Sequence, residues 1–268
     1  MDIIITPPVS PILLSFNNIS IRYYGVIMAF AFVIGVILSY KLFKNKSHLK
    51  DAEIFLDYSP MIILFSIIGA RLFYVIALHE FYLNNPLEII LINHGGLSLF
   101  GAIFFGIVSL YLFSRIKKFD FLLHIDTIAV AFPLCQSIGR FGNFFNQEAY
   151  GTPTDGILKL FVAQEYRTSK FIDIEYYHPT FLYESILDFI IFVILLILYN
   201  KNKINGSIAC YYLILYSIVR FIIEGIRIDS VCNIGTIPIV RLICIFVFVF
   251  TLICLVLINK KAPEQTGA

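Results

Sequence analysis

Apolar residues form long uninterrupted stretches along this chain of 268 residues, in place of the short alternating patterns of soluble strands and amphipathic helices. A helix needs about 20 mostly apolar residues, with a range of roughly 17 to 25, to cross the hydrocarbon core of a bilayer. Stretches of that length predict seven transmembrane helices, at residues 23–43, 54–78, 97–113, 125–145, 181–199, 207–225 and 239–258.

The composition agrees with a membrane protein. Hydrophobic residues make up 59% of the chain and charged residues 14%, and a soluble protein of that composition would aggregate. A net charge of +2 provides no basic surface for nucleic acid, and five cysteines without a CxxC pair indicate neither a disulfide framework nor a metal site. We therefore expect an all-α integral membrane protein, a single polytopic domain over residues 1–268 with no metal and no cofactor.

Basic residues in the predicted loops set the orientation, because lysine and arginine favour the cytoplasmic side. The loop at 79–96 contains neither residue, and the first twenty residues have no basic stretch, so the first span is expected to be its own insertion signal. We expect the amino terminus outside and the carboxyl terminus in the cytoplasm. The residues predicted to be cytoplasmic are Lys41, Lys44, Lys46, Lys50, Arg115, Lys117, Lys118, Lys201, Lys203, Lys260 and Lys261.

One sizeable segment, residues 152–177, lies outside the predicted spans. It begins with the turn sequence TPTDG, and Ile172, Ile174 and Tyr176 alternate with polar residues at the period of a strand. The segment therefore predicts a small β-hairpin or α/β cap on the outer side, between the fourth and fifth helices.

Polar residues within or beside the spans gather at one depth, toward the outer ends of four helices. An arginine in mid-membrane costs roughly 2.5 to 3.5 kcal/mol on insertion scales. The arginines could reach the outer headgroups or pair structurally with glutamates, but an outer layer of arginines opposes the loop bias and indicates an anionic ligand such as phosphate. The layer consists of Arg71, Arg140, Asn143, Asn146, Glu148, His178, Glu184, Arg220, Glu224 and Arg227.

The end of the fourth span, GRFGNFFNQEAYG, is the densest polar motif. Arg140, Asn143 and Gln147 fall on one stripe of a continuous helix, and glycines beside them allow a close approach of backbone or ligand. Helix packing would explain the glycines but not the polar side chains.

Two later spans carry further polar residues at helical spacing. In the sixth span, Tyr212, Tyr216, Arg220 and Glu224 follow one another at steps of four, with Arg227 beyond them. The fifth span opens with HPTFLYES, which places Thr180, Glu184 and Asp188 on one face behind His178. An ion pair between Arg220 and Glu224 could be structural alone.

These motifs, in this order, resemble the prolipoprotein diacylglyceryl transferase family of bacteria. GRFGNFFNQEAYG carries the most specific part of the resemblance, and RYYG, GARLFY, GGLSLFGA, HPTFLYE and RFIIEGIR match further family blocks, so the resemblance covers nearly the whole chain. Family residues found here are Tyr24, Arg140, Asn143, Glu148, Gly151, Arg220 and Glu224.

The resemblance implies a multi-pass enzyme of the bacterial plasma (inner) membrane, with its active site toward the outer leaflet. Its partners would be phosphatidylglycerol, membrane lipid and the lipobox peptide of a preprolipoprotein. The enzyme would transfer an sn-1,2-diacylglyceryl group to the lipobox cysteine thiol, forming a thioether and releasing glycerol 1-phosphate. No oligomeric state follows from the sequence.

The polar layer and the resemblance together suggest roles for individual residues. Catalytic candidates are Arg140, Arg220, Glu148, Glu224 and Tyr24. Predicted phosphatidylglycerol contacts are Arg140, Asn143, Asn146, Gly151, Arg220 and Arg71, and accessory candidates are His178, Glu184, Arg227 and His94. Arg140 and Arg220 are assigned to the phosphate, whereas Glu148 and Glu224 either pair with those arginines or act as the base.

The sequence departs from the family at one position that bears on the base. Many relatives have a histidine in the third-span block where this chain has Phe100, so an imidazole base at that position is excluded. Either His94 substitutes for it, or the family needs no base there. The rival function is a transporter for an anionic lipid or metabolite. A transporter needs polar residues through the full depth of the membrane, and only Asp57, Asp126 and Asp188 are expected to lie deeper.

Overall fold

The computed structural model describes residues 2–16, 19–46, 49–91, 95–202, 204–228, 233–234 and 237–266. The chain divides into two compact units, one comprising Met1–Ser39 with Ile125–Ala268 and the other Tyr40–His124. Two helices pass from one unit into the other. The expectation of a single domain stays a prediction. Lys203 and His94 lie outside the described residues.

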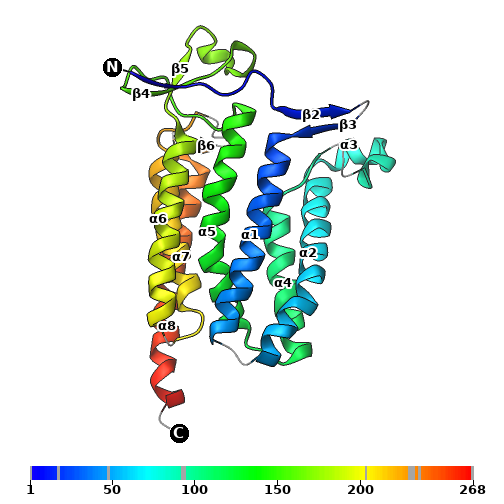
Figure 1. Cartoon of the computed structure of the whole chain (residues 1–268), viewed down its shortest axis with the longest axis vertical. Helices are drawn as coiled ribbons and strands as arrows, with labels where there is room; N and C mark the ends of the chain where they lie inside the picture. The colour runs from blue at the N-terminus through cyan, green and yellow to red at the C-terminus, as the bar shows by residue number, and fades with distance from the viewer. Residues whose placement is uncertain are drawn as a thin grey trace. The chain divides into compact units, whose positions relative to one another are not determined.

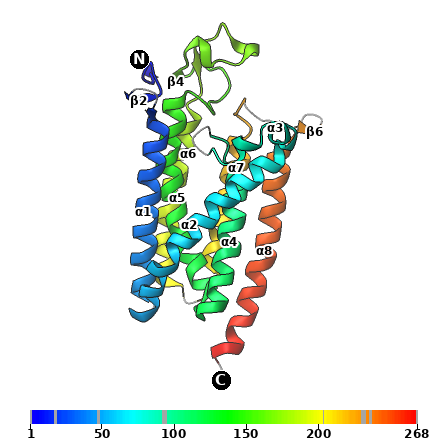
Figure 2. The ribbon, with the colours of Figure 1, turned by 90° about the vertical axis from the view of Figure 1, so that its right-hand side faces the viewer.

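The larger unit is built on helices that run side by side (Figures 1 and 2). Small residues allow α1 and α5 to approach, since a Cβ added to Gly35 would lie 2.5 Å from Cys135 Sγ, and one added to Gly139 would lie 3.2 Å from Met28 Sδ. The helices are α1 (Tyr23–Lys46), α5 (Phe121–Asn146), α6 (Thr180–Lys201), α7 (Ser207–Ile223) and α8 (Ile239–Thr266).

A three-stranded sheet lies at the end of this unit where α5 ends and α6 begins (Figure 1). β4 (Leu158–Phe161) pairs antiparallel with β5 (Tyr176–Tyr177), and β1 (Ile3–Ile5) adds parallel to β4. Lys159 Nζ lies 2.7 Å from Asp2 Oδ2, which ties the amino-terminal strand to the sheet.

Two strands within the predicted segment pair antiparallel, but the second strand is shorter than predicted. That the segment caps the outer side of the membrane stays a prediction. A 3₁₀ turn, η4 (Ser169–Phe171), comes before Ile172, and the strand begins only at Tyr176. The turn is held because Tyr177 Oη donates to the Phe171 carbonyl at 2.8 Å. Burial raises the pKa of Tyr177, which keeps this hydroxyl a donor.

Short strands and a further turn complete the larger unit. They are β2 (Ile12–Phe16), β3 (Ile19–Arg22), β6 (Asn233–Ile234), β7 (Ile237–Pro238) and the 3₁₀ turn η3 (Gln164–Tyr166). β2 and β3 form an antiparallel hairpin directly before α1, and the amide of Tyr23 donates to the Pro11 carbonyl at 3.1 Å.

The smaller unit is a pair of close-packed helices. A Cβ added to Gly101 would lie 2.3 Å from the Gly69 carbonyl oxygen, and one added to Gly106 would lie 2.7 Å from Ser66 Oγ, so the glycines of the third span serve helix packing. Its elements are α2 (Leu49–Ala77), α3 (His79–Asn84), η1 (Pro86–Ile89) and α4 (Leu99–Lys117).

Helix length and composition make this a multi-pass membrane protein. Among the described residues, six helices are long and apolar enough to cross a bilayer, namely α1, α2, α4, α5, α6 and α8. α7 is apolar but has only 17 residues. All seven predicted spans correspond to helices, and that α7 also spans the membrane stays a prediction.

Candidate active site

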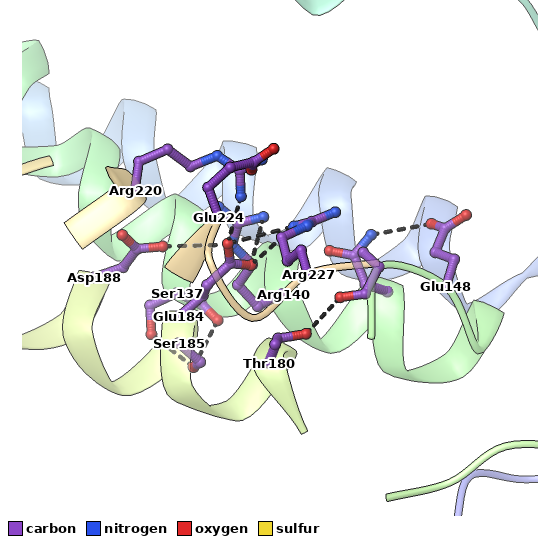
Figure 3. Close-up of polar contacts among 12 residues, drawn as sticks. Ser137, Arg140, Glu148, Thr180, Glu184, Ser185, Asp188, Arg220, Glu224 and Arg227 are labelled. Carbon is purple, nitrogen blue, oxygen red and sulfur yellow. Dashed lines mark hydrogen bonds and ion pairs between the residues drawn. The ribbon is translucent and has the colours of Figure 1, made fainter. Parts of the chain in front are cut away.

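Three arginines from two helices and a loop converge on one glutamate of α6 (Figure 3). Arg140 Nη1 lies 3.0 Å from Glu184 Oε2, and Arg220 Nη1 lies 2.9 Å from Glu184 Oε1. Arg227 Nη1 completes the group at 3.4 Å. Glu184, expected as an accessory residue, therefore lies at the centre of these ion pairs. We call Arg140, Glu184, Arg220 and Arg227 the arginine cluster.

Two further carboxylates balance the arginine cluster. Arg140 Nε lies 3.6 Å from Asp188 Oδ2, and Arg220 Nη2 lies 2.7 Å from Glu224 Oε2, the i to i+4 pair that the sequence predicts. Because a guanidinium has five N–H donors, these pairs use only part of the hydrogen-bonding capacity of each arginine. The cluster can therefore still donate to a phosphate.

Ion pairing and partial burial argue against snorkelling for these arginines. The side chains of Arg140 and Arg220 are each 18% exposed, and that of Arg227 is 10% exposed. Leaving a charge at such a site unpaired costs about 3–5 kcal/mol, so the carboxylates are needed to keep the arginines in place. Thr180, Glu184 and Asp188 are all buried, which confirms that they share one inward face of α6.

Two serine hydroxyls join α5 to α6 beside the cluster. Ser185 Oγ donates to the Ser137 carbonyl at 2.9 Å and lies 3.1 Å from Ser137 Oγ. Ser137 precedes Arg140 by one turn, and Ser185 follows Glu184 directly. These buried bonds fix the register of the two helices in which Arg140 meets Glu184.

The chain turns sharply after α5, and Glu148 lies in the turn. Gln147 and Ala149 on either side of it have left-handed φ angles of 51° and 58°, which cost non-glycine residues roughly 1–2 kcal/mol each. Gln147 Oε1 accepts from the amide of Ala163 at 2.8 Å, and Thr180 Oγ1 donates to the Ala149 carbonyl at 2.5 Å. Strain held by surrounding contacts in this way is typical of functional sites.

The turn corrects the predicted stripe of polar residues on the fourth span. α5 ends at Asn146, and the left-handed backbone at Gln147 takes this buried side chain off the helix face that carries Arg140 and Asn143. Gln147 holds the loop through its contact with the Ala163 amide.

Glu148 differs from the glutamates of the arginine cluster in exposure and in partners. It is exposed, whereas Glu184 and Glu224 are each 2% exposed. Its Oε1 accepts from the side-chain amides of Asn143 at 3.0 Å and Asn146 at 3.2 Å. Glu224 therefore pairs with an arginine, while Glu148 is held by neutral amides.

Tyr24 reaches the same region from the first turn of α1. A Cβ added to Gly142 would lie 2.7 Å from the Tyr24 ring, so the glycine of GRFGN makes room for the tyrosine. The Tyr24 hydroxyl is close enough to Glu148 and Arg140 to interact electrostatically with both.

Gly151 joins three segments of the site. Its amide donates to the His178 carbonyl at 3.0 Å, it forms a β-bridge with Arg227, and the next amide, of Thr152, donates to the Ile226 carbonyl at 2.7 Å. A Cβ at position 151 would lie 2.7 Å from His178 Cβ and 2.9 Å from Thr180 Cγ2. Packing alone thus requires glycine here.

Gly151→Ala is expected to destabilise the protein by about 1–3 kcal/mol, the usual cost of overpacking, and to lower activity by displacing the loop that carries Arg227. Thermal unfolding of the purified variant measures the loss. Gly156→Ala is the matched control, because its Cβ would meet only the Thr154 hydroxyl, at 3.2 Å. Equal stability of both variants would contradict the packing role of Gly151.

Two predicted site residues have local roles in the structure. Arg71, 7% exposed, lies in the smaller unit and donates to backbone carbonyls of the segment after α3. Its contact with lipid phosphate stays a prediction. Its acceptors are the carbonyls of Glu88, Ile89, Leu91, Gly95 and Gly96. The second residue is His178, whose Nδ1 lies 3.4 Å from Tyr183 Oη. Phe100, which stands where many relatives have histidine, is 75% exposed.

Comparisons with known proteins identify the family. The family model described as prolipoprotein diacylglyceryl transferase matches residues 11–257. The chain belongs to this family. Similar proteins named phosphatidylglycerol–prolipoprotein diacylglyceryl transferase include one from Parasynechococcus marenigrum, 41% identical over 85% of this chain and 83% of its own, and one from Clostridium novyi, 37% identical over 94% and 97%.

Sequence reasoning missed two partners of the arginine cluster in this family member. Asp188 was expected to lie deeper than the polar layer, but it pairs with Arg140, since one further turn of α6 keeps it within reach of a long arginine side chain. Tyr216 interacts electrostatically with Arg140, Arg220 and Glu184. The i+4 spacing of Tyr216 to Arg220 was the available signal.

Proposed function

We propose that this protein transfers the sn-1,2-diacylglyceryl group of phosphatidylglycerol to the lipobox cysteine of preprolipoproteins, the first step of lipoprotein maturation. It is a transferase by family membership. The observation that carries the proposal is the convergence of Arg140, Arg220 and Arg227 on Glu184. A phosphate diester is the anionic part of phosphatidylglycerol, and guanidinium groups match its geometry.

The reaction needs a base and a stabilised leaving group. The cysteine thiol loses its proton to Glu148, and the thiolate forms a C–S bond to the diacylglyceryl carbon that bears the phosphate ester. The C–O bond breaks with its electron pair moving to the phosphate, so glycerol 1-phosphate leaves. Arg140 and Arg220 donate to oxygens on which negative charge grows, and Asn143 and Asn146 orient the headgroup.

Glu148 suits the base better than Glu224 does. Glu224 is buried and its Oε2 is paired with Arg220 Nη2 at 2.7 Å, so its carboxylate is occupied and shielded from a thiol. Glu148 is exposed and accepts from two neutral amides at one oxygen, so a thiol has access to the carboxylate.

A transporter of an anionic lipid or metabolite fits the same residues less well. Arg140, Arg220 and Arg227 are fixed by Glu184 at a single depth, and a transported anion would need cationic sites along its path. Glu148 would also have no role in transport. These observations favour catalysis.

Orientation follows from the loop charges and the polar layer. We propose an amino terminus outside the bacterial plasma membrane, the carboxyl terminus in the cytoplasm, the sheet as an outer cap and the site at the outer leaflet. Seven spans are needed for that arrangement. α7 supplies the seventh, because 17 helical residues extend about 26 Å and the hydrocarbon can thin locally around a short helix.

Cysteine labelling tests the orientation. In a parent without its own cysteines, Asp155→Cys in the exposed cap is expected to react with an impermeant maleimide in intact cells, and Lys201→Cys at the end of α6 is expected to react only after lysis. The reverse pattern would place the polar layer at the cytoplasmic leaflet.

The proposed reaction is tested by supplying the purified protein with phosphatidylglycerol and a synthetic lipobox peptide. We expect the peptide mass to increase by one diacylglyceryl group, and the increase to disappear when serine replaces the peptide cysteine. Uptake of lipid or phosphate into vesicles with no change in the peptide would favour the transporter.

A further inference from the structure

Arg241 lies in the first turn of α8, a helix that packs against α7. Its Cζ lies 5.1 Å from the centroid of the Phe221 ring, and a Cβ added to Gly225 would overlap its Nη2. Phe221 belongs to the last turn of α7, and Gly225 follows shortly after that helix ends. The ring and the glycine therefore hold the guanidinium against the end of α7.

The Arg241 guanidinium has neither an ion pair nor a hydrogen bond within the part of the chain that the structure describes. Arg71 and Arg140, which are also largely withdrawn from solvent, have carbonyl or carboxylate acceptors. Arg241 Nε is buried, but the residue is partly exposed and its terminal nitrogens keep accessible surface. Because a charge withdrawn from water normally has an acceptor or a counter-ion, these terminal donors indicate an anion from outside the chain.

We propose that Arg241 binds the phosphate of phosphatidylglycerol on the α7–α8 surface and recruits this lipid to the arginine cluster, an inference that rests on the proposed function. A guanidinium donates paired hydrogen bonds to a phosphate diester. About one helical turn farther from the α7–α8 connection, Ile218 of α7 and Ile245 of α8 are 44% and 50% exposed. Their side chains provide an apolar surface for the acyl chains.

The Arg241 site adjoins the arginine cluster. Cys244, one turn after Arg241 on α8, is buried and interacts electrostatically with Arg220 and Glu224. The two residues that contact Arg241 from the end of α7 follow directly after Arg220 and Glu224 in the sequence. A lipid held at Arg241 therefore has its phosphate next to the groups that act on it.

Charge favours phosphatidylglycerol over other ligands. Glu184, Asp188 and Glu224 supply as many carboxylates as the arginine cluster has guanidinium groups, so these paired groups are neutral together. The charge of Arg241 therefore gives this end of the site its attraction for an anion. Among the described residues no carboxylate forms an ion pair with Arg241 that could instead receive the ammonium group of a zwitterionic phospholipid, and a peptide main chain carries no charge.

Arg241→Gln tests the site, because it removes the charge and keeps most of the side-chain length. Transfer to a lipobox peptide is measured in phosphatidylcholine vesicles with increasing mole fractions of phosphatidylglycerol. The fraction that gives half-maximal transfer is expected to rise about tenfold, the loss of a charge-assisted hydrogen bond. The maximal rate and the KM for the peptide should stay unchanged.

Lys170→Gln is the matched control, since Lys170 is also a cation over an aromatic ring, 5.0 Å from the centroid of Phe171, but is exposed in the sheet region away from α7 and α8. Its lipid dependence should equal that of the wild type. An unchanged lipid dependence in an active Arg241→Gln protein would overturn the proposal. A lower maximal rate alone would also overturn it, because Arg241 would then act in the chemical step.

Glycerol 1-phosphate is a second source of a phosphate, and its inhibition of both proteins separates product from lipid. Weaker inhibition of Arg241→Gln, with the same lipid dependence as the wild type, would assign Arg241 to the product and refute lipid binding there.

Photolabelling of the wild-type protein removes any dependence on variant folding or on transfer. With the peptide omitted, phosphatidylglycerol that carries a photoreactive group in its headgroup is expected to attach within residues 218–225 or 237–245, as located by mass spectrometry. Excess phosphatidylglycerol should suppress this labelling more than phosphatidylethanolamine does. Absence of label from both ranges, or equal suppression by the two lipids, would contradict the proposal, whereas failure of the wild-type protein to form thioether would refute the proposed function.

Discussion

Arg140→Ala is expected to lower the transfer rate by at least about 10²–10³-fold, the loss usually found when one donor to a developing oxyanion is removed. Arg140 is the arginine that links α5 to both Glu184 and Asp188, at 3.0 and 3.6 Å. Arg140→Lys should restore little activity, because an ammonium group cannot reproduce two parallel N–H donors. Diacylglyceryl transfer to peptide by the purified variants measures both effects.

Loss of Arg140 also leaves the buried Asp188 without its ion-pair partner, so a folding defect must be separated from a catalytic one. The double variant Arg140→Ala/Asp188→Asn removes both charges and should recover stability without recovering activity. Arg115→Ala, in the last turn of α4, controls for removal of an arginine from a spanning helix. Wild-type turnover by a folded Arg140→Ala protein would end the phosphate assignment.

Glu148→Gln is expected to slow transfer by about 10²–10⁴-fold, the usual contribution of a general base. A free thiol has a pKa of about 8.5, so raising the pH increases the thiolate fraction and should partly restore the variant. Glu224→Gln breaks the ion pair with Arg220, and its loss of rate should not be repaired by pH. The pH–rate profiles of both variants measure this difference.

Glu175→Gln is the matched control for the base, since Glu175 is an exposed glutamate of the same unit and its backbone carbonyl makes the contact with the Val162 amide. Its profile should follow that of the wild type. Activity of Glu148→Gln within a few fold of wild type, with an unchanged pH profile, would remove Glu148 from this role.

The helices could be predicted from the sequence because each spanning segment is a long apolar run that depends on no partner. The short amino-terminal strand could not be predicted. Ile3–Ile5 pairs with Leu158–Phe161, and nothing in three isoleucines specifies a parallel partner more than 150 residues away. The strand expected from Ile172 onward failed for a similar reason, since a turn held by Tyr177 overrides the local alternation.

The members of the polar layer could be predicted from the free-energy cost of placing charged residues in the membrane and from their positions in the predicted spans. Which residues pair with one another could not be predicted. Arg220 and Glu224 share one helix, so their spacing alone predicts their ion pair. Glu184 meets Arg140 and Arg227 only because α5, α6 and the loop after α7 pack together, with Ser137 and Ser185 setting the register. Tertiary packing determines such contacts, and the packing of separate helices cannot be derived from the spacing of residues in one sequence.

The central claim is that the arginine cluster stabilises a phosphate that leaves when the thioether forms. It is tested most directly by following phosphatidylglycerol labelled in its terminal glycerol together with the lipobox peptide. The account predicts that labelled glycerol 1-phosphate appears in the aqueous phase in a one-to-one ratio with thioether peptide, and that neither appears with Arg140→Ala. Thioether formation with the label retained in lipid, or released as free glycerol, would contradict it.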